Sequence, residues 1–166
     1  DIDEQHRVLV TILNRLAWHF ASDSSDLDSL HLLDELLAYA SYHFKYEEGV
    51  WAESLGASEM ARNHHDSHQM FFVRIQMLRQ SKAPQADVLA ELFDYLTRWL
   101  AFHILESDRR MALTVKAMKA GKPLEEARER VDSELNGSVS VLVTALLEIY
   151  GKLSASTIQL MREKMA

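Results

Sequence analysis

The sequence contains no cysteine, which excludes disulfide bonds, thiolate zinc sites, cysteine-held iron–sulfur clusters and a cysteine nucleophile. Glycine and proline are also scarce, at 5 and 2 of the 166 residues, where average usage would give roughly 20. Turns are therefore few, which argues against a β-sandwich, a β-barrel or a glycine-rich phosphate-binding loop. We predict an all-α protein of long helices with short connections.

Positive charge and long apolar runs are missing as well. Lys and Arg number 18 against 25 Asp and Glu, a net charge of −7, and no basic run occurs, so we expect no nucleic-acid partner. No apolar run approaches the roughly 18 residues of a membrane span, and no signal-peptide pattern opens the chain. We therefore expect a cytoplasmic protein without a membrane span. The first residues resemble the inside of a helix, so we expect an excerpt of a longer protein.

Apolar residues recur at helical spacing through most of the chain. They predict four long helices, over about residues 2–20, from a cap at Ser25 to Leu55, over about 59–80 and over about 85–119. Four long helices with short links favour an up-down-up-down bundle. We expect residues 1–120 to form this bundle and residues 121–166 to form a helical extension.

The extension has its own apolar pattern. A short helix is expected from Pro123 to about Leu135, followed by a break at Asn136-Gly137. Steps of three and four residues then separate the apolar positions, which are Val139, Leu142, Leu146, Ile149, Leu153 and, after Ser156, Leu160. Such a heptad seam predicts a coiled-coil connector and a homodimer through the 139–160 helix. The alternative is an amphipathic hairpin packed on the bundle.

Polar side chains of the metal-ligand type interrupt the inward-facing apolar stripes of all four long helices. They are His6, His43, Glu47, His64, His68, His103 and Asp108. Burying such groups without partners costs several kcal/mol each, and a metal would offset that cost. Five imidazoles are too many for one tetrahedral zinc, whereas two carboxylates that can bridge favour a dinuclear centre.

Iron suits this mixture of nitrogen and oxygen donors, although affinity order alone does not separate iron from manganese. The ferritin-like di-iron site requires Glu-x-x-His on two helices, and no Glu stands three residues before any His here. One spacing is irregular, because Asp108 follows His103 by five residues, about 140° around an ideal helix. Either a π-like turn occurs there or the site spans that angle.

Four motifs together resemble the bacterial hemerythrin domain. They are Asp3-Glu4-Gln5-His6, His43-Phe44-x-x-Glu47-Glu48, His64-x-x-x-His68 and Trp99-Leu100-x-x-His103-Ile104-x-x-x-Asp108. The resemblance covers residues 1–120 and implies a pair of iron ions bridged by an oxo or hydroxo group. It implies that His64, His68 and His103 hold one iron, that His6 and His43 hold the other, and that Glu47 and Asp108 bridge them. One open position on the second iron would bind dioxygen.

Residues around this set are assigned in the same way. The resemblance implies an apolar oxygen pocket formed by Leu9, Phe44, Leu100 and Ile104, although ordinary core positions fit the sequence equally well. His19, His31 and His65 fall outside the ligand pattern and are expected to be solvated or at the boundary of the core. Glu48 is expected to be a supporting or surface acid and not a ligand.

The tail suggests a sensory function. The stretch Ile149-Tyr150-x-x-Leu153-Ser154-x-x-Thr157-x-Gln159-Leu160-Met161-Arg162-Glu163 resembles the connector in bacterial hemerythrin domains fused to diguanylate cyclases. We therefore expect a non-enzymatic dioxygen-binding domain that reports oxygen or redox state to a C-terminal output domain in cyclic di-GMP signalling. The alternatives are a stand-alone oxygen store or carrier, and an oxidase or peroxidase, which would need an acid/base group and a substrate channel that the sequence does not show.

Overall fold

The computed structural model describes residues 1–21, 26–136 and 138–165, and these residues form helices with no strand. The helices are α1 (Ile2–Ala21), α2 (Asp26–Leu55), α3 (Glu59–Arg79), α4 (Gln85–Phe102), the π-helical segment η1 (His103–Asp108), α5 (Arg109–Lys119), α6 (Leu124–Leu135) and α7 (Ser138–Met165). The all-α prediction is confirmed. The predicted cap at Ser25 lies outside the described residues.

Local signals set several of the helix ends. Gly56 (φ 53°) and Gly121 (φ 95°) follow α2 and α5 in the left-handed region, where glycine avoids the steric penalty of a Cβ atom. The Ser58 hydroxyl accepts a hydrogen bond from the Ala61 N–H at 3.2 Å and caps α3. The turn between α2 and α3 is therefore short, and it places these helices side by side.

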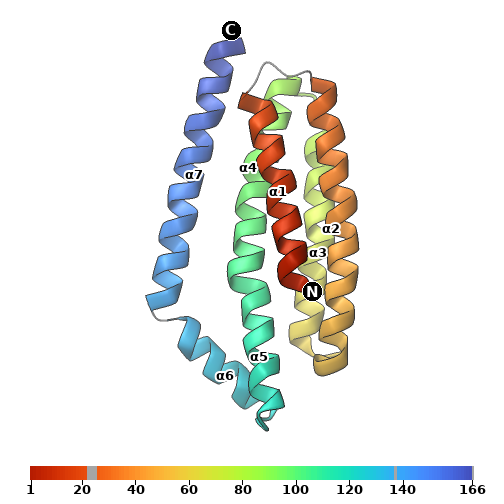
Figure 1. The fold of residues 1–166 in the computed structure, drawn as a ribbon, viewed down its shortest axis with the longest axis vertical. Coiled ribbons are helices and arrows are strands. Elements are labelled where there is room, and N and C mark those ends of the chain that lie inside the picture. Colours follow the sequence, from red (N-terminus) through yellow and green to blue (C-terminus); the bar gives the residue numbers. More distant parts are fainter. Residues whose placement is uncertain (22–25, 137, 166) are drawn as a thin grey trace.

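Helices α1, α2, α3 and the continuous rod α4–η1–α5 form an antiparallel bundle (Figure 1). The larger part of its core is apolar and includes Leu9, Leu36, Phe71 and Leu96, each fully or almost fully buried. A smaller apolar cluster of Trp51, Leu55, Met111 and Val115 lies between α2 and α5. Along the rod α4–η1–α5, the polar residues His103 and Asp108 lie between Leu100 of the larger cluster and Met111 of the smaller one.

The extension folds back along the bundle (Figure 1). Helix α6 buries Ala127, Val131 and Leu135 and packs on α5, while α7 packs along α4 and contacts α1. Gly151 is buried where α7 meets α4, and a Cβ atom there would lie 3.0 Å from the Arg98 guanidinium. The extension therefore packs on the bundle through α6 and through one face of α7.

The predicted seam is largely exposed, although Leu146 also lines a cavity against Leu13 and Leu100 of the bundle. Its described side chains are 51–63% exposed, namely Leu142, Leu146, Ile149, Leu153 and Leu160. The side chain of Val139, the first predicted seam position, lies outside the described part of the structure. Helix α7 thus uses one face for the bundle and leaves a second, apolar face uncovered. Within the described residues, no helix combines the length and apolarity needed to cross a membrane.

Candidate metal centre

The structure brings all seven predicted ligand residues into one buried region between the two apolar clusters. They come from every long helix: His6 from α1, His43 and Glu47 from α2, His64 and His68 from α3, and His103 and Asp108 from the two ends of η1. His6 is the most exposed of them, at 9%. Their side chains form two groups of four that share Glu47, and within each group the candidate ligand atoms lie within 4.8 Å of one another.

Helix geometry accounts for this convergence. His43 and Glu47, like His64 and His68, are one helical turn apart and therefore share an inward face. His103 and Asp108 are five residues apart, and η1 provides the wider turn that brings His103 Nε2 within 3.1 Å of Asp108 Oδ1. The π-like turn was therefore the correct alternative, in keeping with the frequent occurrence of such turns at functional sites.

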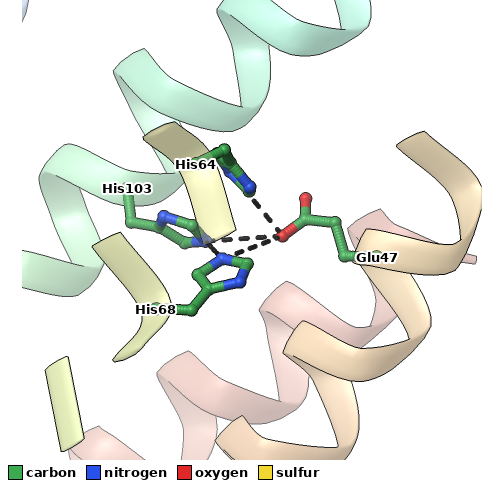
Figure 2. A group of neighbouring side chains, drawn as sticks. All are labelled: Glu47, His64, His68 and His103. Atoms are coloured by element: carbon green, nitrogen blue, oxygen red, sulfur yellow. Dashed lines mark hydrogen bonds and ion pairs between the residues drawn. The ribbon is translucent and has the colours of Figure 1, made fainter. Parts of the chain in front are cut away.

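The first group consists of Glu47, His64, His68 and His103 (Figure 2). Glu47 Oε2 lies 3.5 Å from His103 Nε2, 3.6 Å from His68 Nε2 and 4.0 Å from His64 Nε2. These distances are longer than hydrogen bonds of about 2.7–3.2 Å. Two ligands that each lie about 2.1 Å from one metal ion are separated by roughly 3.0–3.4 Å. The Glu47 distances lie just above this range, and the 3.3 Å between His68 Nε2 and His103 Nε2 lies within it, so the four donor atoms surround a common point.

The second group consists of His6, His43, Glu47 and Asp108. His43 Nε2 lies 3.7 Å from Glu47 Oε2, and His6 Nε2 lies 2.9 Å from Asp108 Oδ2. The other oxygen of Asp108 lies 2.9 Å from His64 Nε2 in the first group. Asp108 thus directs one oxygen toward each group, and Glu47 belongs to both. Two carboxylates in these positions suit a pair of ions rather than one.

Several buried atoms of the centre have no hydrogen-bond partner among the described residues. They include both carboxylate oxygens of Glu47 and Nε2 of His43. Unpaired buried acceptors of this kind are costly. Because their lone pairs converge on one region, a bound cation would satisfy them together, and the residues present fit a metal centre.

Burial and mutual charge separate the pKa values of the two carboxyl groups. Burial and the nearby charge of Asp108 raise the pKa of Glu47 to about 8. Burial also acts to raise the pKa of Asp108, but hydrogen bonds with His6 and His64 outweigh burial and hold that pKa well below its usual range. In the metal-free protein at neutral pH, the pair therefore shares close to one negative charge, and a cation would favour ionisation of both.

Burial also keeps imidazoles of the centre neutral. It lowers the pKa of His43 and His103 to about 4, and it holds the pKa of His68 well below its usual value. A neutral imidazole offers the nitrogen lone pair that a metal requires. These three imidazoles are therefore in their metal-binding form at neutral pH.

Two side chains outside the ligand set support particular imidazoles. Gln5 Oε1 lies 2.9 Å from His43 Nδ1, and Glu48 Oε1 lies 2.7 Å from His68 Nδ1. Each oxygen can accept the Nδ1 proton, which leaves Nε2 directed into the centre as an acceptor. Glu48 is thus the supporting acid that was considered. The role of Gln5 was missed, because it depends on the register between α1 and α2, for which the sequence gives no signal.

The remaining predicted residues lie in different places. His19, His31 and His65 belong to neither group: His31 is exposed, His19 is partly buried, and His65, half exposed, pairs with Glu48 at 2.9 Å.

Leu9 and Phe44 are buried in the core, where Phe44 stacks on the His68 ring at 4.0 Å between ring centres. Leu100 and Ile104 instead line an apolar cavity of about 220 Å³, which Leu13, Leu146 and Tyr150 also line. Of the four residues expected at the oxygen pocket, Leu100 and Ile104 line this cavity, and Leu9 and Phe44 lie in the larger core cluster.

The fold and the centre define a helical bundle with a buried cation-binding cluster. The family described as Hemerythrin HHE cation binding domain matches residues 1–114. The chain is 32% identical over 117 residues to a bacteriohemerythrin of Stenotrophomonas maltophilia, covering 70% of this chain and 74% of that protein. It is 31% identical over 114 residues to a bacteriohemerythrin of Clostridium acetobutylicum, covering 65% and 86%. No solved structure was found to match. The chain belongs to the hemerythrin family.

Proposed function

We propose that this chain holds two iron ions and binds dioxygen at them. The observation that carries the proposal is the pair of four-residue groups that share Glu47 and are linked by the two oxygens of Asp108. In this assignment His64, His68 and His103 would hold one ion, His6 and His43 would hold the other, and Glu47 and Asp108 would be shared between them, with an oxo or hydroxo group as a further ligand. When bound, the iron pair supplies reversible electron transfer to dioxygen.

The surrounding residues support this role in three ways. Glu47 and Asp108 offset part of the ionic charge inside a buried site, where uncompensated charge is costly. Gln5 and Glu48 hold the tautomers of His43 and His68. The two apolar clusters exclude bulk water from both ends of the centre and so protect a reduced metal from side reactions.

The unequal numbers of histidines favour a position for an external ligand. One group has three imidazoles and Glu47, and the other has two imidazoles, Glu47 and Asp108. Because Asp108 Oδ1 also lies 2.9 Å from His64 Nε2, both carboxylates can serve both groups, and the groups then differ by one imidazole. The ion held by His6 and His43 therefore has one protein ligand fewer, and we infer that dioxygen binds there. Leu9, Phe44, Leu100 and Ile104 are the apolar residues we expect around it.

Metal analysis combined with spectroscopy tests this proposal. We expect about two irons per chain in purified protein, and a visible absorption spectrum that changes when the anaerobically reduced protein is exposed to dioxygen. His31→Ala serves as the control, because His31 is exposed and outside both groups. A stoichiometry near one, or zinc or manganese in place of iron, would contradict the assignment.

We further propose a sensory role, in which α6 and α7 connect the metal centre to an output domain such as a diguanylate cyclase. The uncovered apolar face of α7 supports a coiled-coil dimer through residues 139–160. In this view the chain itself is not an enzyme. A stand-alone oxygen store is favoured instead if α7 only packs on its own bundle, as its contacts with α4 allow. Sedimentation of the full chain distinguishes the two.

A further inference from the structure

An ion-pair network joins the metal centre to the extension. Arg110, in the first turn of α5, donates from Nη2 to Glu106 in η1 and from Nη1 to Asp132 in α6. The three side chains are 26%, 17% and 48% exposed, respectively. The carboxylate in η1 is therefore the least exposed member, and one cation is shared between two acids from different helices.

Glu106 connects this network to the metal centre. Glu106 lies within η1, between His103 and Asp108, and both of those residues belong to the buried centre. Their spacing of five residues faces one site only because this segment is π-helical. A contact that holds Glu106 therefore also restrains the turn that aligns the two candidate ligands.

The far end of the network is firmly anchored. Asp132 follows Val131, which is buried where α6 packs on α5. The network also borders a cleft of about 390 Å³, which is lined by Arg110, Asp132 and His64 among others. Ion pairs on an open surface contribute little, but here both ends are attached to packed helices, so movement of either carboxylate strains the other.

We propose that Arg110 is a positioning residue of the metal centre, which holds η1 in its π-helical form through Glu106 and couples that form to the docking of α6 through Asp132. The coupling rests on the proposed function, because it requires metal at His103 and Asp108. Coupling between two equilibria is reciprocal. If docking of α6 favours metal binding, metal binding must favour docking of α6 by the same factor.

The test uses Asp132→Asn in the full chain, with anaerobic Fe(II) as the probe. Glu125→Gln is the matched control, since it removes the same charge from α6 but its 3.4 Å pair with Arg128 lies within that helix. We expect the equilibrium Kd for Fe(II), measured by competition with a chelator, to rise about 5- to 10-fold in Asp132→Asn and to stay at the parent value in Glu125→Gln. Asp132→Glu, which keeps the charge, should recover most of the difference.

Hydrogen exchange of the α6 amides provides a second readout, which a purely structural role would not change. In the parent, iron should slow this exchange several-fold, and the slowing should be largely absent in Asp132→Asn. Equal loss of iron to the chelator at equilibrium from the parent and from Asp132→Asn would overturn the coupling. The coupling would also be overturned if the parent carries two irons and its α6 amides exchange at the same rate with and without iron. A parent that takes up no iron overturns the proposed function itself. Arg110→Gln, which breaks both pairs, provides an independent variant.

Discussion

Helices α4 and α7 carry apolar stripes of similar regularity, yet the two stripes face opposite environments. Leu89, Leu92, Leu96 and Leu100 of α4 are at most 4% exposed, whereas the described seam residues of α7 are at least 51% exposed. Periodicity shows that a helix has an apolar face but does not show what covers that face. In the bundle the cover comes from the same chain. On α7 it must come from elsewhere, or the face remains in solvent.

The largest effect should come from the buried centre of the bundle. Replacing Glu47 by Ala removes an acid shared by both groups and leaves two cations facing each other. We expect both irons to be lost or greatly weakened, as measured by elemental analysis. The neighbouring positions His64 and His65 provide the control: His64→Ala should impair metal binding, and His65→Ala should have little effect. If His65→Ala impaired metal binding and His64→Ala did not, the register assigned to α3 would be wrong by one residue.

The second largest effect compares the two stripes directly. Leu96→Ala should destabilise the protein by about 2–5 kcal/mol, because it leaves a cavity in a close-packed core. Leu142→Ala removes the same atoms from a side chain that is 63% exposed and should change stability by less than about 0.5 kcal/mol. Chemical denaturation at low protein concentration measures both. A similar loss in the two variants would mean that the α7 stripe is buried in solution.

The bundle also shows which features could be predicted from the sequence and which could not. The end of α2 at Leu55 and the start of α3 near residue 59 were predicted from the sequence, and Gly56 and Ser58 set them in the structure. The ligand-type residues were found because their spacing matched the inward face of each helix. The continuous helix expected over 85–119 contains η1, which helix propensity does not reveal. Only the chemical requirement that His103 and Asp108 face one site indicated it.

Contacts between helices were beyond reach for a different reason. The pairing of Gln5 with His43, and of Arg110 with Asp132, depends on how far one helix slides along another. That register is set by the packing of many core side chains together and not by any local pattern. The packing of α7 on the bundle depends on register in the same way. For this reason the sequence did not predict that Leu100 and Ile104 line a cavity together with residues of α7.

The uncovered face of α7 can be tested by sedimentation of the full chain. Leu142→Lys and Ile149→Lys introduce charge on the face that is 63% and 55% exposed at those positions, and Thr144→Lys adds the same charge at another exposed position of α7. If a second chain covers the seam, the parent sediments as a dimer, and the first two variants shift toward monomer while the third does not. A monomeric parent would favour a face that stays in solvent.

Acid should distinguish the centre from the rest of the metal-free protein. The folded-state pKa of His43 and His103, about 4, lies below the ordinary value of 6.5, so the unfolded chain binds more protons between those limits and stability falls as pH drops from 6.5 to 4. Glu47, with a pKa of about 8, acts in the opposite sense between 4.5 and 8. Because the histidines outnumber it below 6.5, stability should peak near neutral pH. Thermal unfolding across pH measures this, and unchanged stability down to pH 4 would contradict the burial of neutral imidazoles.

The smallest effect compares two helical glycines, Gly49 in α2 of the bundle and Gly151 in α7 of the extension. Gly49 lies on an exposed part of α2, and a Cβ atom there meets nothing within 4 Å. Gly49→Ala should therefore stabilise the protein by about 0.5–1 kcal/mol through helix propensity alone. Gly151→Ala offers α7 the same propensity, but its Cβ atom would lie 3.0 Å from the Arg98 guanidinium, which also pairs with Asp94. Arg98 must shift to make room, so the gain should be smaller. Equal gains from the two substitutions in chemical denaturation would show that α7 does not rest closely on α4 in solution.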